Sequence, residues 1–193
     1  MKNFLVALLI TLSLPALAVT EVAGVTFAET AKVGAGETAL NGAGMRGVRF
    51  LKGYAMAMYL PRKTTTATEA LSMNGPKRLI IVPLINTPGE AFATALPNGI
   101  RKNHSAQEVA VLDARIQALK ATLMAISTIR KGAKVHLDWL PDTHSGITRL
   151  TINGETQGED IAGEDFYKAL LNIWLGDHPT QRDLKENLLG KTP

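Results

Sequence analysis

The stretch Asn41–Leu60 reads NGAGMRGVRFLKGYAMAMYL and combines a glycine-rich segment, an arginine between its glycines and an alternating segment. Its glycines, Gly42, Gly44 and Gly47, allow the backbone to take positive φ values and allow another group to approach closely. Arg46 lies between them and carries a planar, permanently charged fork that suits a carboxylate, phenolate or phosphate. The alternative for the same residues is a glycine-rich bend between strands with a surface arginine.

Side chains alternate along the second half of this stretch, which predicts a strand. One face carries Tyr54, Met56, Met58 and Leu60, and the other carries Ala55, Ala57 and Tyr59. A phenol therefore stands at the head of an apolar row, with the Arg46 guanidinium just upstream.

The segment GAGMRG also satisfies the dinucleotide-binding pattern G-x-G-x-x-G. That pattern needs a strand before it and a helix N-terminus after it to receive the pyrophosphate. The residues that follow here are β-branched, aromatic and alternating, and they predict a strand or hairpin. We therefore reject a nucleotide site at this position.

The N-terminus has the features of a cleaved secretory signal. Lys2 gives a basic start, residues 4–14 form an apolar run too short to span a bilayer, and residues 15–18 supply an A-x-A cleavage site. The sequence thus predicts a signal peptide over residues 1–18 and a mature chain from Val19, with no membrane span after signal removal. The predicted compartment is a bacterial periplasm or the external medium.

Composition indicates one globular domain over residues 19–193, because no linker or charge block divides the chain. The absence of cysteine excludes disulfides, thiol chemistry and a lipoprotein anchor. The formal charge of +4 is spread along the sequence without a basic stripe, so no nucleic-acid partner is expected. No residue pattern specifies an oligomeric state.

Helices and strands alternate beyond the first third of the chain. The clearest helix covers residues 105–127, where Ser105 and Glu108 form a capping box. A second covers residues 89–102, with a kink or break expected at Pro97. A third covers residues 164–175, and Gly176 is placed to end it in a left-handed conformation.

A continuous apolar run at residues 78–84 and alternating segments at residues 129–140 and 147–152 predict strands, and a tight turn joins the last two. The class is therefore α+β with a mainly antiparallel sheet.

The sequence lacks the residue spacings that a metal site or a catalytic triad requires. The four histidines have no spacing typical of metal ligands, so neither a metal nor a cofactor is expected. Asp142, His144 and Ser145 have the residue types of a catalytic triad, but neighbours in one turn cannot form the required relay. Arg46 with Tyr54 remains as a pair able to bind one anionic group beside an apolar site.

The sequence resembles the chalcone isomerase-like family, and in particular its exported bacterial branch. The resemblance rests on NGAGMRG at residues 41–47, KGYAMAMYLP at residues 52–61 and FYKALLNIWLGDHPTQRDLKENLLG at residues 166–190. It implies an open-faced β-sandwich, with helices on one face of a large antiparallel sheet and a ligand cleft between them.

The resemblance also implies roles for individual residues. Arg46 matches the arginine that binds the reacting oxygens in the plant enzymes, and Tyr54 falls where those enzymes have a threonine. Asn98 corresponds to a catalytic asparagine, whereas the enzymes' tyrosine falls on Ala91 or Phe92, neither of which has a hydroxyl. The enzymes' full catalytic set is therefore not present.

Two functions follow from these expectations. The first is a noncatalytic binder of a small amphipathic carboxylate such as a fatty acid, because the plastid fatty-acid-binding members of the family hold a carboxylate with an arginine and a tyrosine. Arg46, Tyr54 and Asn98 would contact the ligand, and Met56 and Met58 would adapt to its chain. The alternative is an isomerase, an intramolecular lyase acting on a chalcone-like phenolic enone, with Arg46, Tyr54 and Asn98 as catalytic candidates.

Overall fold

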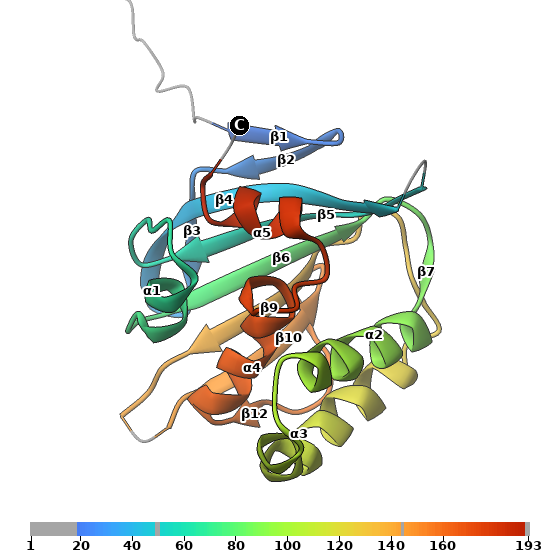
Figure 1. Ribbon diagram of the computed structural model, residues 1–193. Helices are drawn as coiled ribbons and strands as arrows, with labels where there is room; N and C mark the ends of the chain where they lie inside the picture. Colours follow the sequence, from blue (N-terminus) through green and yellow to red (C-terminus); the bar gives the residue numbers. More distant parts are fainter. Residues whose placement is uncertain (1–18, 49–50, 144, 192–193) are drawn as a thin grey trace, which may run out of the picture.

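The computed structural model describes residues 19–48, 51–143 and 145–191, so the predicted signal peptide lies outside the described residues. One large sheet dominates this part of the chain, with strand order β11-β10-β9-β6-β5-β4-β3 and β12 paired to β10 (Figure 1). The neighbouring strands of this sheet are antiparallel. Its strands are β3 (Thr30–Val33), β4 (Gly36–Val48), β5 (Leu51–Leu60), β6 (Lys77–Pro83), β9 (Val135–Leu140), β10 (Ile147–Ile152), β11 (Glu155–Thr156) and β12 (Ile161–Ala162).

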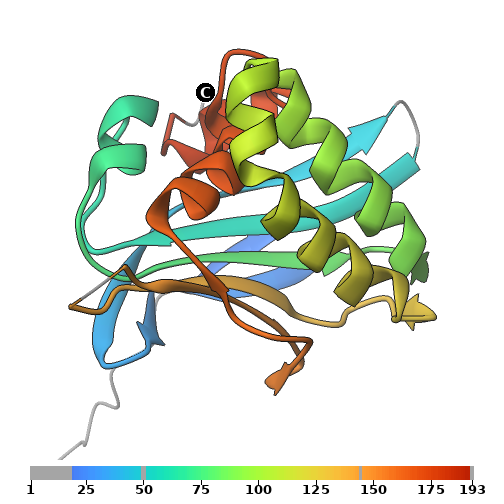
Figure 2. The same ribbon diagram turned by 90° about the horizontal axis from the view of Figure 1, so that it is seen from below.

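Helices cover one face of this sheet, and the views in Figures 1 and 2 agree on which face it is. They are α1 (Ala67–Ser72), α2 (Gly89–Lys102), α3 (Ala106–Met124), α4 (Glu164–Leu175) and α5 (Arg182–Leu188). Each contributes buried residues to the larger apolar core, which it shares with the helix-facing side chains of the sheet. The predicted α+β class and the open-faced β-sandwich are confirmed.

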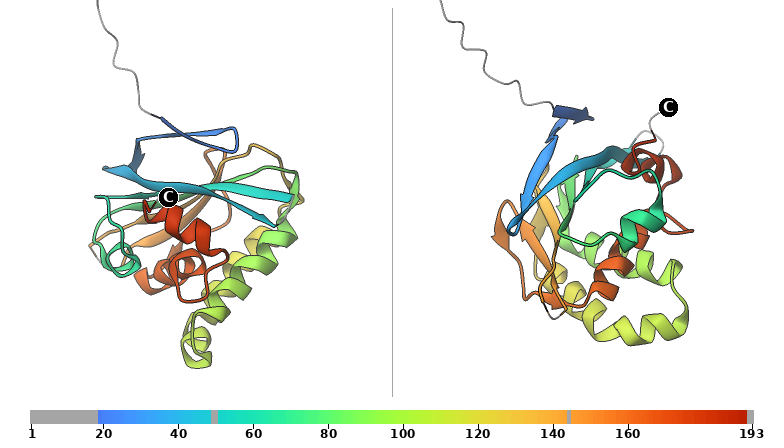
Figure 3. Two further views of the ribbon diagram at one scale, coloured as in Figure 1. Left: turned by 45° about the horizontal axis from the view of Figure 1, so that its top comes forward. Right: turned by 90° about the vertical axis from the view of Figure 1, so that its left-hand side faces the viewer.

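The alternation predicted for β5 is confirmed. Tyr54, Met56, Met58 and Leu60 face the helices and belong to the larger core. Ala55, Ala57 and Tyr59 face the other way and belong to a smaller core. The hairpin of β1 (Val19–Val22) and β2 (Val25–Ala28) covers this second face (Figure 3), and the Tyr59 hydroxyl donates to the carbonyl of Ala28 at 2.8 Å.

A capping box explains where α3 begins, and core packing explains why α2 continues past Pro97. The capping box of α3 is present, since Ser105 accepts from the Glu108 amide and the Glu108 carboxylate accepts from the Ser105 amide. Of the kink or break expected at Pro97, the break is wrong, because α2 continues to Lys102. Apolar residues on both sides of Pro97, such as Phe92 and Ile100, are buried in the core, and their packing outweighs the lost backbone bond.

The strands β7 (Thr87–Pro88) and β8 (Thr128–Ile129) form a separate short ladder beside the start of α2. Within the described ranges no helix is long and apolar enough to cross a membrane.

The glycine-rich segment is itself part of strand β4, which corrects the expectation of a bend with positive φ. Neither Gly42, Gly44 nor Gly47 has a positive φ. Instead, helix α5 lies directly on the strand: a Cβ added at Gly42 would lie 2.1 Å from the carbonyl oxygen of Asn187. A Cβ at Gly44 would lie 2.8 Å from the Asn187 Cβ. These glycines therefore permit the close approach of α5.

Gly42→Ala is expected to lower the free energy of unfolding by about 2 kcal/mol, because the added methyl overlaps a backbone atom that cannot rotate away. Gly44→Ala is the matched comparison and is expected to cost less, since its further contacts are the amide of Asn187 and a methyl of Leu184, which can move. Urea denaturation of both variants tests the order. Equal stability of Gly42→Ala and wild type would contradict the explanation.

Candidate functional site

Arg46 and Tyr54 come together because β4 and β5 pair antiparallel and place the two residues directly opposite each other. Directly opposed residues point to the same face of a sheet. The guanidinium carbon of Arg46 lies 5.9 Å from the centroid of the Tyr54 ring, within the range of a cation–π contact. The predicted pair is thus assembled by the strand register itself.

A β-bulge adjoins this pair. Arg46 pairs with Tyr54 whereas Gly47 pairs with Lys52, so Gly53 is an extra residue on β5. A Cβ at Gly53 would lie 3.2 Å from the Arg46 carbonyl oxygen and 3.8 Å from its Nη1 atom. The glycine therefore keeps space open beside the guanidinium.

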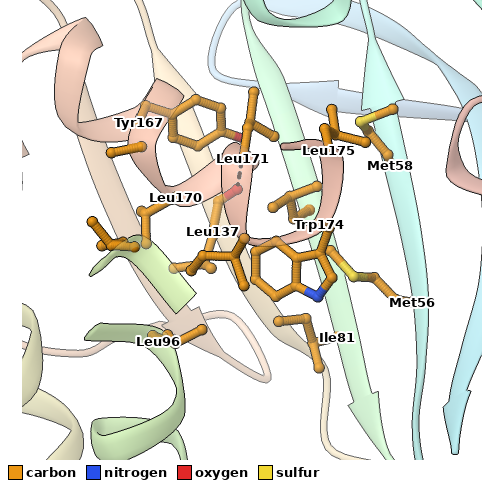
Figure 4. Packing of buried hydrophobic residues seen from close by; sticks show 14 of the residues in the cluster. Met56, Met58, Ile81, Leu96, Leu137, Tyr167, Leu170, Leu171, Trp174 and Leu175 are labelled. Carbon is orange, nitrogen blue, oxygen red and sulfur yellow. Dashed lines mark hydrogen bonds between the residues drawn. The ribbon is translucent and has the colours of Figure 1, made fainter. Parts of the chain in front are cut away.

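Trp174, on α4, forms a hydrogen bond with Tyr54. Its indole N–H donates to the Tyr54 hydroxyl oxygen at 2.8 Å. The indole is 2% exposed, and Figure 4 shows it beside Ile81 and Met56. Burial raises the pKa of Tyr54, and the Trp174 hydrogen bond and the Arg46 charge oppose this rise only in part. Tyr54 therefore remains a protonated phenol, able to donate, at neutral pH.

These residues open onto a cleft of about 1010 Å³ between the sheet, α2 and the segment that joins α4 to α5. Its apolar wall includes Ile81, Ile85, Phe92, Leu96 and Ile173. The exposed Ala91 and Ala95 of α2 also line it and leave room because their side chains are small. The cleft can therefore accept an apolar group longer than a single side chain.

Charged side chains in the cleft are mostly cationic. Arg46, Lys102 and Arg182 line it, against one carboxylate, Asp177. None of these three cations forms an ion pair with a residue in the described part of the chain. Their combined field favours an anionic ligand.

The connection between α4 and α5, residues 176–181, closes one end of the cleft as a strap. Asn103 holds it twice, accepting from the His178 amide at 2.8 Å and donating to the His178 carbonyl at 3.1 Å. At the far end of the strap, Gln181 accepts from the Gly47 amide at 3.1 Å. The strap is therefore fastened both to Asn103, the residue that follows α2, and to the strand that carries Arg46.

Gly176, at the start of the strap, corrects one sequence expectation. Its φ is −70°, so it does not end α4 in a left-handed conformation. A Cβ there would lie 2.3 Å from the Asn103 side-chain oxygen. A glycine is needed at this position because Asn103 approaches the backbone so closely.

The remaining predicted site residues divide into two groups. Asn98 lines the cleft and is exposed. Met56 and Met58 share the face of Tyr54 but are fully buried in the core and do not line the cleft. An apolar ligand chain in this cleft would contact the α2 wall rather than the methionines.

The residues of the site that were not predicted include Trp174, Lys102 and Arg182. Trp174 belongs to the apolar face of its helix, and helical periodicity gave no reason to separate it from the core residues around it. Among the described residues, no group of three or more histidine, aspartate or glutamate side chains could hold a metal ion.

A large antiparallel sheet with helices on one face and a cleft between them defines an α+β protein of the open-faced sandwich class. The sequence matches the profile of the chalcone isomerase-like family over residues 19–190, and the chain belongs to that family. No curated protein sequence matches it.

Among solved structures, the fold is similar to that of a fatty-acid binding protein of Arabidopsis thaliana, with a TM-score of 0.65 and 13% sequence identity. The match covers 86% of this chain and 92% of the plant protein. At this identity the likeness demonstrates a shared fold.

Proposed function

We propose that the protein is an exported, periplasmic binding protein for a small amphipathic carboxylate such as a fatty acid. The observation that carries the proposal is the Arg46–Tyr54 pair at the wall of an apolar cleft. The fatty-acid binding protein of Arabidopsis thaliana shares this fold, and its name supports the same class of ligand.

The head group of such a ligand would be held by electrostatic attraction and by hydrogen bonds of defined direction. The guanidinium of Arg46 can donate two parallel hydrogen bonds to a carboxylate, and charge-assisted bonds are roughly twice as strong as neutral ones. Tyr54 adds a third donor, since its pKa is raised and it keeps its proton. Lys102 and Arg182 add positive potential at the same cleft.

The apolar tail would lie along α2, against Phe92 and Leu96 and over the small side chains of Ala91 and Ala95. Each buried methylene contributes about 0.8 kcal/mol. Affinity is therefore expected to rise with chain length until the tail fills the cleft.

The proposal is tested by native mass spectrometry of protein purified from its own compartment. A bound acyl carboxylate, lost on delipidation and regained with decanoate at one molecule per chain, is the expected result. Absence of any ligand, together with failure of delipidated protein to bind decanoate, would refute the proposal.

Isomerase activity on a chalcone-like enone is the alternative function. Ala91 and Phe92 line the cleft where the family resemblance implies a catalytic tyrosine, and neither has a hydroxyl to donate. We therefore expect chalcone absorbance to decay at the spontaneous rate when the protein is added. A protein-dependent acceleration that disappears in Arg46→Ala would instead support the enzyme.

A further inference from the structure

The Tyr54 hydroxyl has one identified partner and one unused hydrogen. Its oxygen accepts the indole N–H of Trp174 at 2.8 Å. No residue in the described ranges accepts the Tyr54 hydroxyl hydrogen. Because Tyr54 lines the cleft, the acceptor for this hydrogen must come from the contents of the cleft.

The direction of that hydrogen is not free. A phenolic O–H lies near the ring plane, where it can point to either side of the oxygen, and an incoming N–H donor occupies the lone pair on one side. The Trp174 N–H therefore leaves the other side for the hydroxyl hydrogen. The indole itself is held by core packing between α4 and the sheet, beside Ile81 and Met56 (Figure 4).

We propose that Trp174 is a positioning residue that fixes Tyr54 as a hydrogen-bond donor into the cleft. The site therefore favours ligand head groups that accept hydrogen bonds and do not donate them. The inference rests on the proposed function for the identity of the head group, a carboxylate. Arg46 supplies donors and no acceptor, so the two strand residues and Trp174 together form a site with a single hydrogen-bond polarity. An ionised carboxylate satisfies it, whereas the N–H group of an amide head would oppose it.

The same arrangement limits the chemistry of Tyr54. Burial raises the pKa of Tyr54, so the base form of this residue, the phenolate, is not present at neutral pH, and the oxygen of the neutral phenol already accepts the indole N–H. It can donate to a ligand oxygen but is not suited to remove a proton from the ligand.

The test is a double-mutant cycle on decanoate affinity, measured by calorimetry with delipidated protein. Trp174→Phe keeps an aromatic ring but removes the N–H, and it is expected to weaken binding about fivefold, as is Tyr54→Phe. The double variant should bind no more weakly than Tyr54→Phe alone, because Trp174 acts through the Tyr54 hydroxyl. Trp139→Phe, the other tryptophan of the chain and a core residue outside the cleft, is the control and should leave affinity unchanged.

Independent, multiplying effects of Trp174→Phe and Tyr54→Phe would overturn the inference and leave Trp174 as a packing residue only. A ligand-free measurement separates this result from failure of the proposed function. In NMR spectra, the Trp174 indole N–H should exchange with solvent faster in Tyr54→Phe than in the wild type. An unchanged exchange rate would overturn the inference even if decanoate binds, whereas faster exchange without decanoate binding would refute only the proposed carboxylate ligand.

Discussion

Arg46→Ala is expected to weaken decanoate binding by about 50-fold, because a carboxylate in the cleft loses its paired charge and two charge-assisted hydrogen bonds. Thermal stability should change little, since Arg46 forms no ion pair with a described residue and only stacks on Tyr54. Calorimetric titration and a thermal melt of the same sample provide both measurements.

Arg101→Ala is the matched control for charge. Arg101 is exposed on α2 beside the cleft residue Lys102 but does not line the cleft itself. Its removal should reduce affinity less than twofold, as expected for a screened surface charge. Equal weakening by the two substitutions would mean that binding depends on the overall field of the protein, and it would contradict the direct role of Arg46.

Substitution of Lys77 is expected to have the largest effect on the free energy of unfolding. It lies at the start of β6, is 1% exposed, and its ammonium has no hydrogen-bond partner among the described residues. Burial lowers the pKa of Lys77 from 10.5 to about 8, while Glu164 on α4 raises it and Lys168 on α4 lowers it further. The folded protein therefore holds a poorly compensated charge at neutral pH.

Lys77→Met is expected to raise the free energy of unfolding by about 3 kcal/mol at pH 7, which is the free-energy equivalent of this pKa difference. The sign follows from proton binding: between pH 8 and pH 10.5 the unfolded chain binds this proton and the folded chain does not, so wild-type stability rises with pH. The advantage of the methionine variant should be full below pH 8 and fade as pH approaches 10.5. Urea denaturation across this range measures it.

Lys77→Arg serves as the comparison, because arginine keeps its charge throughout this pH range. It should be less stable than the wild type at pH 10, where Lys77 is neutral in the folded state. If Lys77→Met is no more stable than the wild type at pH 7, the ammonium must have a polar partner, such as a bound water, that compensates its burial.

The sequence predicted the features of the fold that depend on local patterns. Alternation from Tyr54 to Leu60 gave the correct faces of β5, and the Ser105 capping box marked the start of α3. Arg46 and Tyr54 lie together as expected, because β4 and β5 follow each other in the sequence and their pairing depends only on this local segment.

The features that were missed depend on contacts between distant segments. Met56 has the same orientation as Tyr54, yet α4 covers it, and a period of two specifies the face of a strand but not what lies above it. The Trp174–Tyr54 hydrogen bond joins residues 120 positions apart. Close approach of another group was one of the two expectations for Gly42, but the sequence did not show that this group is a helix from the end of the chain.

The central claim is that the cleft recognises a carboxylate at the head of an apolar chain. Calorimetric titration of delipidated protein with decanoate and with 1-decanol tests it most directly, because the two ligands share the chain and differ in the head group. We predict one decanoate bound per chain, at least about tenfold more tightly than the alcohol. Equal affinity for the two ligands, or no binding of decanoate, would contradict the account.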